Sequence, residues 1–422
     1  MTAARTLIRG GHVLTMDPRL GDLPATDVLV DGDTIADVRP GIDAPDADVV
    51  DAAGRLVLPG FVDAHRHMWQ AVLRGYGADQ TLGEYFSTVL GGLGPRLTPD
   101  ELYLGDLLSA LAALDAGITT VQDISNVPKP TPEHSDALVA ALRDSGVRAV
   151  FAYGHGTAAD AGRLRAGELS SGGLVTMALN AEASGDTDVR DGWRLARDLD
   201  VPIALHVRGG APLSRIDRVA GLRPGTVYIH GTGLAPGELR LMADSGGALA
   251  VAPAIELTMG HGMPPTGEAL AAGLRPALST DVEVAAAGDM FTQMRAAFQA
   301  ARFAALHGPS SGGPLPTVRA VLEWATVDGA RALGLDGRVG AVRPGMQADL
   351  IVLDTSRPGV RPIYDPAGTI VSAMDRADVD TVLVAGRFRK RGGRLAHPGI
   401  AGLLERADTV RDRLRALDGG IS

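Results

Sequence analysis

The sequence contains no cysteine. Disulfide bonds are therefore excluded, and any bound metal ion must be held by imidazole and carboxylate groups, a donor set that suits zinc, iron, manganese or nickel. Aromatic residues make up only 4% of the chain, whereas hydrophobic residues as a whole reach 45%. This composition is typical of a globular protein in which small residues let helices and strands pack closely.

Positive charge is also scarce, because 40 lysines and arginines stand against 50 acidic residues, for a net charge of −10. No basic face is evident, so we expect a small-molecule partner rather than a nucleic acid or an anionic membrane. No apolar run approaches the length of about 20 residues that a membrane-spanning helix needs, and residues 1–18 lack the apolar core of a signal peptide. We therefore expect a cytoplasmic protein.

Short β-branched runs separated by glycine and aspartate turns occur near both ends of the chain. The stretch VLVAGRF at 382–388 is similar to VLVDGDT at 28–34. These patterns predict that residues 1–59 and 339–395 together build one small β-sandwich, and that 396–422 form a helical tail.

Between these ends, residues 60–338 contain eight short apolar runs that alternate with helical segments. The runs are LVLPGFVDAH, GITTVQDI, VRAVFAYG, LVTMALN, VPIALHV, TVYIHG, ALAVAP and LRPALSTD. Continuous apolar strands joined by crossover helices are typical of a parallel sheet. The sequence therefore predicts an α/β fold with a (β/α)8 barrel; a doubly wound open sheet is disfavoured because no glycine-rich dinucleotide fingerprint follows any strand.

Histidines and one aspartate stand at the ends of four predicted strands. His65 and His67 lie two residues apart in GFVDAHRHMW, so both side chains project to the same side. His206, His230 and Asp281 each end another strand, where barrel enzymes assemble their sites. Singly, each of these residues is explained as a polar strand end or a hydrogen-bonded core residue, but together they predict a metal site on one rim.

Three neutral imidazoles and one carboxylate leave a divalent ion with an open position at which water is activated. Asp281 is suited to bind the ion and accept the proton of the attacking water. His230 is suited either to hydrogen-bond the nucleophile or to serve as a further ligand. No lysine ends any of these strands, so a single ion is expected rather than two.

Other polar or aromatic residues near the predicted rim are candidates for substrate contact or proton transfer. They are Trp69, Gln70, Asp123, His155, Glu182, Arg208 and Glu256. Each also has an ordinary structural explanation, such as core packing for an aromatic ring, helix capping for an acid or an ion pair for an arginine.

In combination, LVLPGFVDAHRH, the VYIHG and LSTDVEV regions, and the returning ADLIVLD resemble the amidohydrolase superfamily, in particular its branch of cytosine, guanine and adenosine-type deaminases and s-triazine hydrolases. The resemblance implies that His65, His67, His206 and Asp281 bind one divalent ion, zinc by preference or iron, and that His230 orients water or substrate. It also implies hydrolysis of a C–N bond in a small nitrogenous heterocycle, and a homodimer or homotetramer.

One departure from the family pattern concerns proton transfer. The deaminating branch commonly carries a glutamate three residues after the strand-five histidine, where HVRGG places Gly209. We expect another group, with Glu256 as the first candidate, to supply the proton. The departure also suits an alternative reaction at the same metal site, in which a leaving group other than nitrogen, such as halide, is displaced. A catalytically silent binding protein of this fold is the remaining alternative.

Overall fold

Eight apolar runs supply the strands of one parallel sheet, as the sequence predicts, although the first four residues of the first run, Leu56–Pro59, form a strand of another sheet. In the computed structural model, which describes residues 5–170, 172–209, 213–308 and 315–418, these strands lie in chain order side by side. They are β6 (Phe61–Arg66), β7 (Ile118–Ser125), β8 (Arg148–Tyr153), β9 (Val175–Asn180), β10 (Ile203–Arg208), β11 (Thr226–Thr232), β12 (Ala248–Val251) and β13 (Ala277–Leu278).

The first and last strands of this sheet are joined just beyond β13. Arg66 and Asp281 form a parallel bridge, in which the backbone N–H of Asp281 donates to the carbonyl of His65 and the N–H of His67 donates to the carbonyl of Asp281. The sheet is therefore closed into a barrel, which confirms the predicted fold class. Closure also places the residues after β13 against the end of β6.

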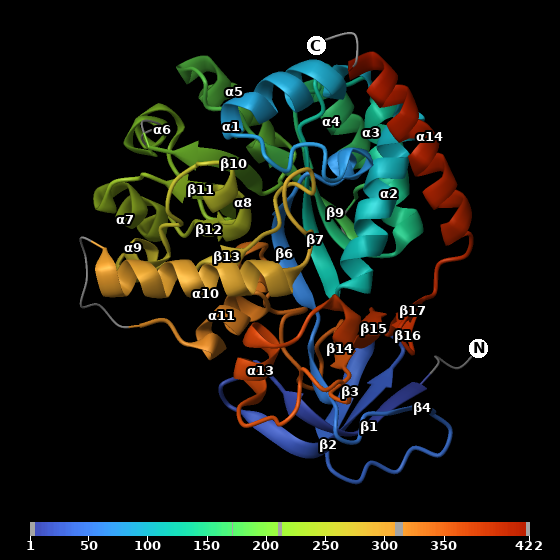
Figure 1. The fold of residues 1–422 in the computed structure, drawn as a ribbon. Coiled ribbons are helices and arrows are strands. Elements are labelled where there is room, and N and C mark those ends of the chain that lie inside the picture. The colour runs from blue at the N-terminus through green and yellow to red at the C-terminus, as the bar shows by residue number, and fades with distance from the viewer. Residues whose placement is uncertain (1–4, 171, 210–212, 309–314, 419–422) are drawn as a thin grey trace.

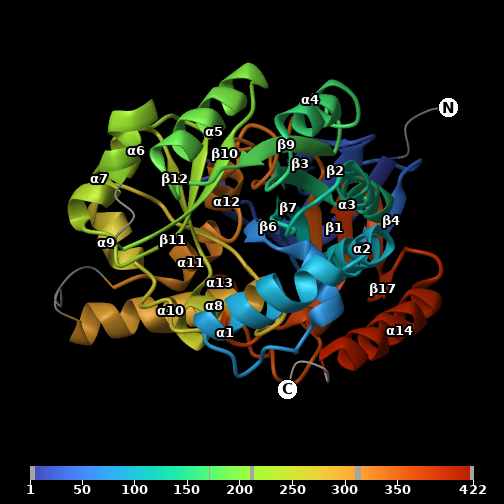
Figure 2. The same ribbon diagram turned by 90° about the horizontal axis from the view of Figure 1, so that it is seen from above.

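Helices follow the barrel strands and surround them in the view from above (Figure 2). The outer helices are α2 (Pro99–Asp115), α3 (Pro132–Ser145), α4 (Ala158–Ala166), α5 (Asp186–Asp198), α6 (Leu213–Ala220), α7 (Pro236–Asp244) and α10 (Met290–His307). Shorter elements are η1 (Met68–Leu73), α1 (Leu82–Tyr85), η2 (Phe86–Leu93), η3 (Gly94–Arg96), α8 (Pro253–Thr258), α9 (Thr266–Ala271), α11 (Val318–Trp324), α12 (Val327–Ala332), α13 (Pro366–Ser372) and η4 (Arg376–Asp378).

Strands from both chain ends form a second sheet, which lies below the barrel in Figure 1. Its strands are β1 (Arg5–Leu14), β2 (Asp22–Asp31), β3 (Thr34–Arg39), β4 (Asp48–Asp51), β5 (Leu56–Pro59), β14 (Leu350–Leu353), β15 (Val379–Val384), β16 (Arg387–Arg391) and β17 (Arg394–Leu395). The order β17-β16-β15-β14-β5-β1-β2-β3, with β4 on β1, pairs β5 with β14 and so joins the two ends.

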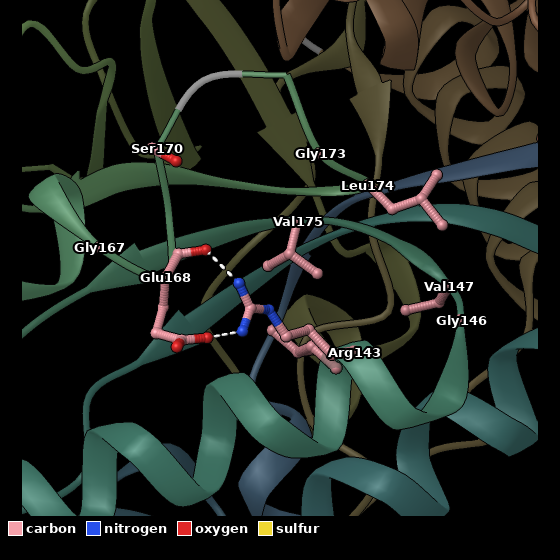
Figure 3. Close-up of a pocket in the computed structure, with 10 residues that line it drawn as sticks. Arg143, Gly146, Val147, Gly167, Glu168, Ser170, Gly173, Leu174 and Val175 are labelled. Atoms are coloured by element: carbon pink, nitrogen blue, oxygen red, sulfur yellow. Dashed lines mark hydrogen bonds and ion pairs between the residues drawn. The ribbon is translucent and has the colours of Figure 1, made fainter.

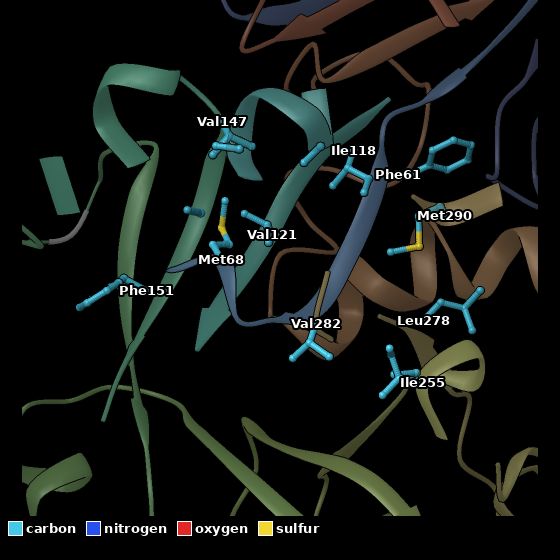
Figure 4. Close-up of a cluster of buried hydrophobic side chains, with 14 of the residues drawn as sticks. Phe61, Met68, Ile118, Val121, Val147, Phe151, Ile255, Leu278, Val282 and Met290 are labelled. Carbon is cyan, nitrogen blue, oxygen red and sulfur yellow. The ribbon is translucent and has the colours of Figure 1, made fainter. Parts of the chain in front are cut away.

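The main hydrophobic core fills the space between barrel strands and outer helices. Figure 4 shows Phe61, Ile118 and Phe151 from the strands, with Met290 at the start of α10. A second cluster consists largely of alanine and valine from the strands and packs against α12. These small side chains bring the strands and the helix close together, so the barrel is a firm support for the residues at its rim.

The C-terminal segment is the helix α14 (Ile400–Asp418), which packs on α2 and η1. Leu403, Val410 and Leu414 form its buried stripe, and the Tyr76 hydroxyl donates to Asp418 across 3.0 Å. Within the described part of the chain, no helix combines the length and apolar character required to cross a membrane.

Candidate metal and catalytic site

Five titratable side chains converge where the barrel strands end. The Nε2 atom of His65 lies 3.1 Å from Nε2 of His67 and 3.2 Å from Nε2 of His206. Oδ1 of Asp281 lies 3.5 Å from Nε2 of His65 and 3.6 Å from Nε2 of His67. His230 completes the group, with its Nε2 3.8 Å from Oδ2 of Asp281. Barrel closure brings these residues together from segments more than 200 positions apart in the sequence.

The donor set fits a divalent cation. Burial lowers the pKa of His67 to about 4 and that of His65 well below its ordinary value, so both rings are neutral at neutral pH and their nitrogens can present lone pairs. Lone pairs of two nitrogens 3.1 Å apart repel each other unless a proton or cation lies between them. Burial also raises the pKa of Asp281 to about 6, a cost that a bound cation offsets. The site is therefore able to hold a metal ion.

The backbone conformation is unusual at three titratable residues of the rim. His155, His230 and Asp281 have φ angles of 59°, 68° and 59°, in the left-handed region that side chains other than glycine rarely adopt. Such conformations cost free energy and are concentrated at functional sites. At His230 and Asp281 they direct the side chains toward the other members of the cluster.

Access to the cluster is from the side of β10. His65, His67, His230 and Asp281 are buried, whereas the side chain of His206 is exposed. Arg208, two residues further along β10, is exposed as well. A small molecule can therefore approach past His206 and Arg208.

Glu256 lies behind His230 rather than in the open part of the site. It is completely buried in α8, and its Oε1 atom lies 3.1 Å from Nδ1 of His230 and accepts a hydrogen bond from the backbone N–H of Ala252. Burial lowers the pKa of His230, but the hydrogen bond to Glu256 and the charge of Asp281 outweigh this and raise it overall. The position of Glu256 suits it to orient His230 rather than to touch a substrate.

Trp69 and Gln70 are both buried in η1. The indole N–H of Trp69 donates to Oδ1 of Asn126 across 3.0 Å, and the completely buried ring leaves no surface on which a substrate can stack. Gln70 donates from Nε2 to the hydroxyl of Tyr85 across 2.7 Å. Burial and the charge of Asp281 raise the pKa of Tyr85, which places this pair near the metal-binding side chains.

Asp123 forms a buried acid pair with Asp106 of α2. Its Oδ1 atom accepts a hydrogen bond from the backbone N–H of Met68 across 3.2 Å. Burial raises the pKa of both acids, so the folded pair retains a proton. The pair holds the backbone just after His67 in place and has no exposed surface for a substrate.

His155 and Glu182 form a pair at the ends of two neighbouring strands. His155 follows β8, Glu182 follows β9, and Nε2 of the first lies 3.0 Å from Oε1 of the second. Their side chains are 33% and 52% exposed, respectively, so both are accessible from solvent.

An ionic network behind the rim is a feature that the sequence alone does not reveal in full. Arg66, completely buried between the two metal-motif histidines, contacts Glu283 at 2.5 Å and donates from Nε to Ser109 across 2.8 Å. Glu283 also accepts a hydrogen bond from Nε of Arg74 across 2.7 Å. An arginine within an apolar strand indicates that an acidic residue pairs with it, although the sequence does not identify that residue as Glu283.

A cavity of about 360 Å³ lies at the opposite end of the barrel from the histidines. Residues from Gly146 to Val147 and from Gly173 to Val175 line it, which places it before β8 and at the start of β9 (Figure 3). Arg143 and Glu168 form an ion pair across it. Because the histidines lie at the carboxyl ends of the strands, this cavity is not part of the metal site.

A closed (β/α)8 barrel with histidines and an aspartate at its carboxyl rim defines a metal-dependent hydrolase. The family described as the amidohydrolase family matches residues 56–389, and the chain belongs to it. The protein is therefore a hydrolase of carbon–nitrogen bonds other than peptide bonds, as the sequence motifs imply.

Several proteins resemble the chain over nearly its whole length. A 5-methylthioadenosine/S-adenosylhomocysteine deaminase of Halobacterium salinarum is 30% identical and covers 98% of both chains. A 5'-deoxyadenosine deaminase of Methanothermobacter thermautotrophicus is 28% identical over 92% of this chain and 94% of its own. The crystal structure of an adenosine deaminase from Xanthomonas campestris with bound zinc has a TM-score of 0.88, 26% identity, and coverage of 98% of this chain and 99% of its own.

Proposed function

We propose that the protein deaminates a nucleoside that contains adenine, with release of ammonia from the exocyclic amine. The observation that carries this proposal is the cluster of His65, His67 and His206, with Oδ1 of Asp281 3.5 Å from His65 and 3.6 Å from His67. Full-length similarity to deaminases of 5'-deoxyadenosine and of 5-methylthioadenosine and S-adenosylhomocysteine supports the substrate class.

We assign His65, His67, His206 and Asp281 as the ligands of one divalent ion, with zinc as the preferred metal because a similar structure carries it. When bound, the ion polarises a water molecule and lowers its pKa toward about 7. Asp281 takes a proton from the attacking water, since its second oxygen faces His230 rather than the three nitrogens. His230, held by Glu256, donates a hydrogen bond to the oxygen that develops negative charge.

Around this centre, Arg208 is the exposed residue best placed to contact the part of the substrate that extends toward solvent. We propose that Gln70 and Tyr85 line the inner end of the site, because they are buried close to Asp281. Trp69 and Asp123 are proposed to support the loop after His67 rather than to bind substrate.

The test is an ammonia-release assay with metal-quantified protein. Adenosine, 5'-deoxyadenosine, 5'-methylthioadenosine and S-adenosylhomocysteine are the substrates, with cytosine and guanine for comparison. We expect turnover of at least one adenine nucleoside, loss of turnover after chelation, and recovery with zinc. Failure to release ammonia from every 6-aminopurine nucleoside, by protein that contains one equivalent of metal, would overturn the proposal.

A second candidate function is displacement of a leaving group other than nitrogen. It is favoured by Gly209, because a side chain there would place its Cβ 2.8 Å from the carbonyl oxygen of Gly233 and no acid can occupy that position. A halide leaves without protonation, so such a reaction has less need of an acid. Measuring halide release from 6-chloropurine riboside beside ammonia release from adenosine separates the two functions.

For assembly we propose a homodimer or homotetramer. Phe303 and Leu306 are exposed on α10, an arrangement that supports contact with another copy of the chain. Light scattering on purified protein tests this assignment, and a monomer at all concentrations contradicts it.

A further inference from the structure

Removal of an exocyclic amine requires a proton on the departing nitrogen, because an amide anion is far too basic to leave. This requirement rests on the proposed deamination. The strand-five position cannot meet it, since Gly209 is packed against the backbone of Gly233 and has no room for a side chain. The proton must therefore come from another titratable group near the open side of the site.

Three acidic residues near the rim are buried and interact with other side chains. Glu256 is completely buried behind His230, and Asp123 is buried with Asp106. Glu283 is held by Arg66 and Arg74. None of these three carboxyl groups faces the exposed side of the cluster.

His261 is closer to the site but is a poor acid. Its ring centre lies 4.6 Å from that of His230. Burial and the charges of His230 and Arg208 lower its pKa to about 3, so the ring is neutral at neutral pH. A neutral imidazole is a weak proton donor.

The pair of His155 and Glu182 differs from these groups in accessibility. A third of the His155 side chain and about half of the Glu182 side chain are exposed, and the two are joined at 3.0 Å. The backbone carbonyls of Asn126 and Val127 lie beside His155, while the side chain of Asn126 is a neighbour of His67. Asn126 thus lies between His155 and His67, one of the proposed metal ligands.

The loop that carries His155 is built to hold it in one place. His155 has a φ of 59°, and a glycine stands on each side of it. A Cβ on Gly154 would lie 2.7 Å from the Asn180 amide nitrogen, and one on Gly156 would collide with the Tyr153 hydroxyl. The conformation is costly for a histidine, and close packing of both glycines maintains it.

We propose that His155 is the acid that protonates the leaving nitrogen and that Glu182 is a positioning residue that keeps the imidazole charged and oriented. The oxygen of water bonds to the amine-bearing carbon, and one water proton passes to Asp281 and then to the ring nitrogen. The imidazolium of His155 gives its proton to the amino group, the C–N bond breaks with its electron pair going to nitrogen, and ammonia leaves. The remaining hydroxyl proton returns to His155 as the carbonyl forms.

The charge state of His155 agrees with this role. The hydrogen bond to Glu182 raises the pKa of His155 above its ordinary value, against the lowering effect of burial. A larger fraction of the ring is therefore protonated at neutral pH than in an isolated histidine.

The test compares two leaving groups on one ring. Wild-type enzyme, His155→Gln and Glu182→Gln are assayed with adenosine, which loses ammonia, and with 6-chloropurine riboside, which loses chloride without protonation. His307→Gln serves as the matched control, because His307 is exposed at the end of α10. Metal content is measured for each protein.

We expect His155→Gln to lower kcat for ammonia release by about 10²- to 10⁴-fold while chloride release and metal content change little. Glu182→Gln should give a smaller loss in the same direction. Equal losses with both substrates, or no loss, overturn the role of the pair while wild-type ammonia release still supports the proposed function. Absence of ammonia release by the wild-type enzyme overturns both.

Discussion

Oε1 of Glu256 lies 3.1 Å from Nδ1 of His230, and the opposite nitrogen of the same ring faces Asp281 at 3.8 Å. The carboxylate accepts a hydrogen bond from the Nδ1–H of His230 and fixes the plane of the ring. Glu256 therefore orients His230, and His230 in turn faces the metal-binding side chains.

Replacing Glu256 with glutamine should therefore impair turnover without releasing metal. The amide keeps the size of the side chain but removes the charge that stabilises protonated His230, so we expect a loss of about 10- to 100-fold in kcat. Steady-state kinetics and metal analysis measure the two quantities. Glu268→Gln, an exposed change in α9, is the control, and a fully active Glu256→Gln enzyme would rule out the orienting role.

Changes to the proposed ligands should affect metal binding itself. Asp281→Asn and His206→Ala each remove one donor, so both should lose bound zinc, activity or both. In the wild-type protein, zinc at 100 times its dissociation constant should stabilise the fold by about 2.7 kcal/mol, seen as a higher Tm than after chelation. If both variants retain full metal and full activity, the ligand assignment is incorrect.

Arg66 links the metal-motif strand to the segment after Asp281, and its removal should destabilise the protein. Arg66→Met leaves Glu283 and Asp63 without a buried cationic partner, and losses of this kind cost about 3–5 kcal/mol. Urea unfolding measures the change. Arg319→Met breaks a more exposed pair with Asp22 and should cost less than about 1 kcal/mol. Equal effects of the two substitutions would contradict the structural importance of the Arg66 network.

The buried acids Asp106 and Asp123 make stability depend on pH. Burial raises the pKa of Asp123 to about 7, so the folded pair retains a proton that the unfolded chain releases above about pH 4. The stabilisation is complete below the unfolded pKa and declines as the pH rises toward 7. Asp106→Asn should flatten this decline, and urea unfolding between about pH 5 and pH 7.5 measures it. The exposed change Asp408→Asn should leave the slope as it is; an unchanged slope in Asp106→Asn would refute the shared-proton account.

The strand ends could be predicted from the sequence because buried parallel strands have a simple signature. The end of each strand can be recognised from its local sequence. His65, His206, His230 and Asp281 are therefore placed on one rim without knowledge of any long-range contact. The bridge between Arg66 and Asp281 then brings the first and last of these together. Local pattern is sufficient here because barrel closure follows from the number and direction of the strands.

The supporting contacts could not be predicted in the same way. Whether Glu256 faces His230 or solvent depends on how α8 leaves β12, and the position of Trp69 depends on the close approach of Gly105 in α2 to its backbone. His155 and Glu182 lie 27 positions apart, and only the adjacency of β8 and β9 joins them. Each of these depends on loop geometry that composition and periodicity do not encode.

Pairing of β5 with β14 has a consequence for biosynthesis. About 290 residues of chain separate Pro59 from Leu350. At about 5–20 residues per second, the ribosome needs roughly 15–60 s to supply the second strand after the first has emerged. During that interval one edge of β5 has no partner, so the nascent polypeptide exposes a strand edge that is able to pair with other chains until β14 has been synthesised.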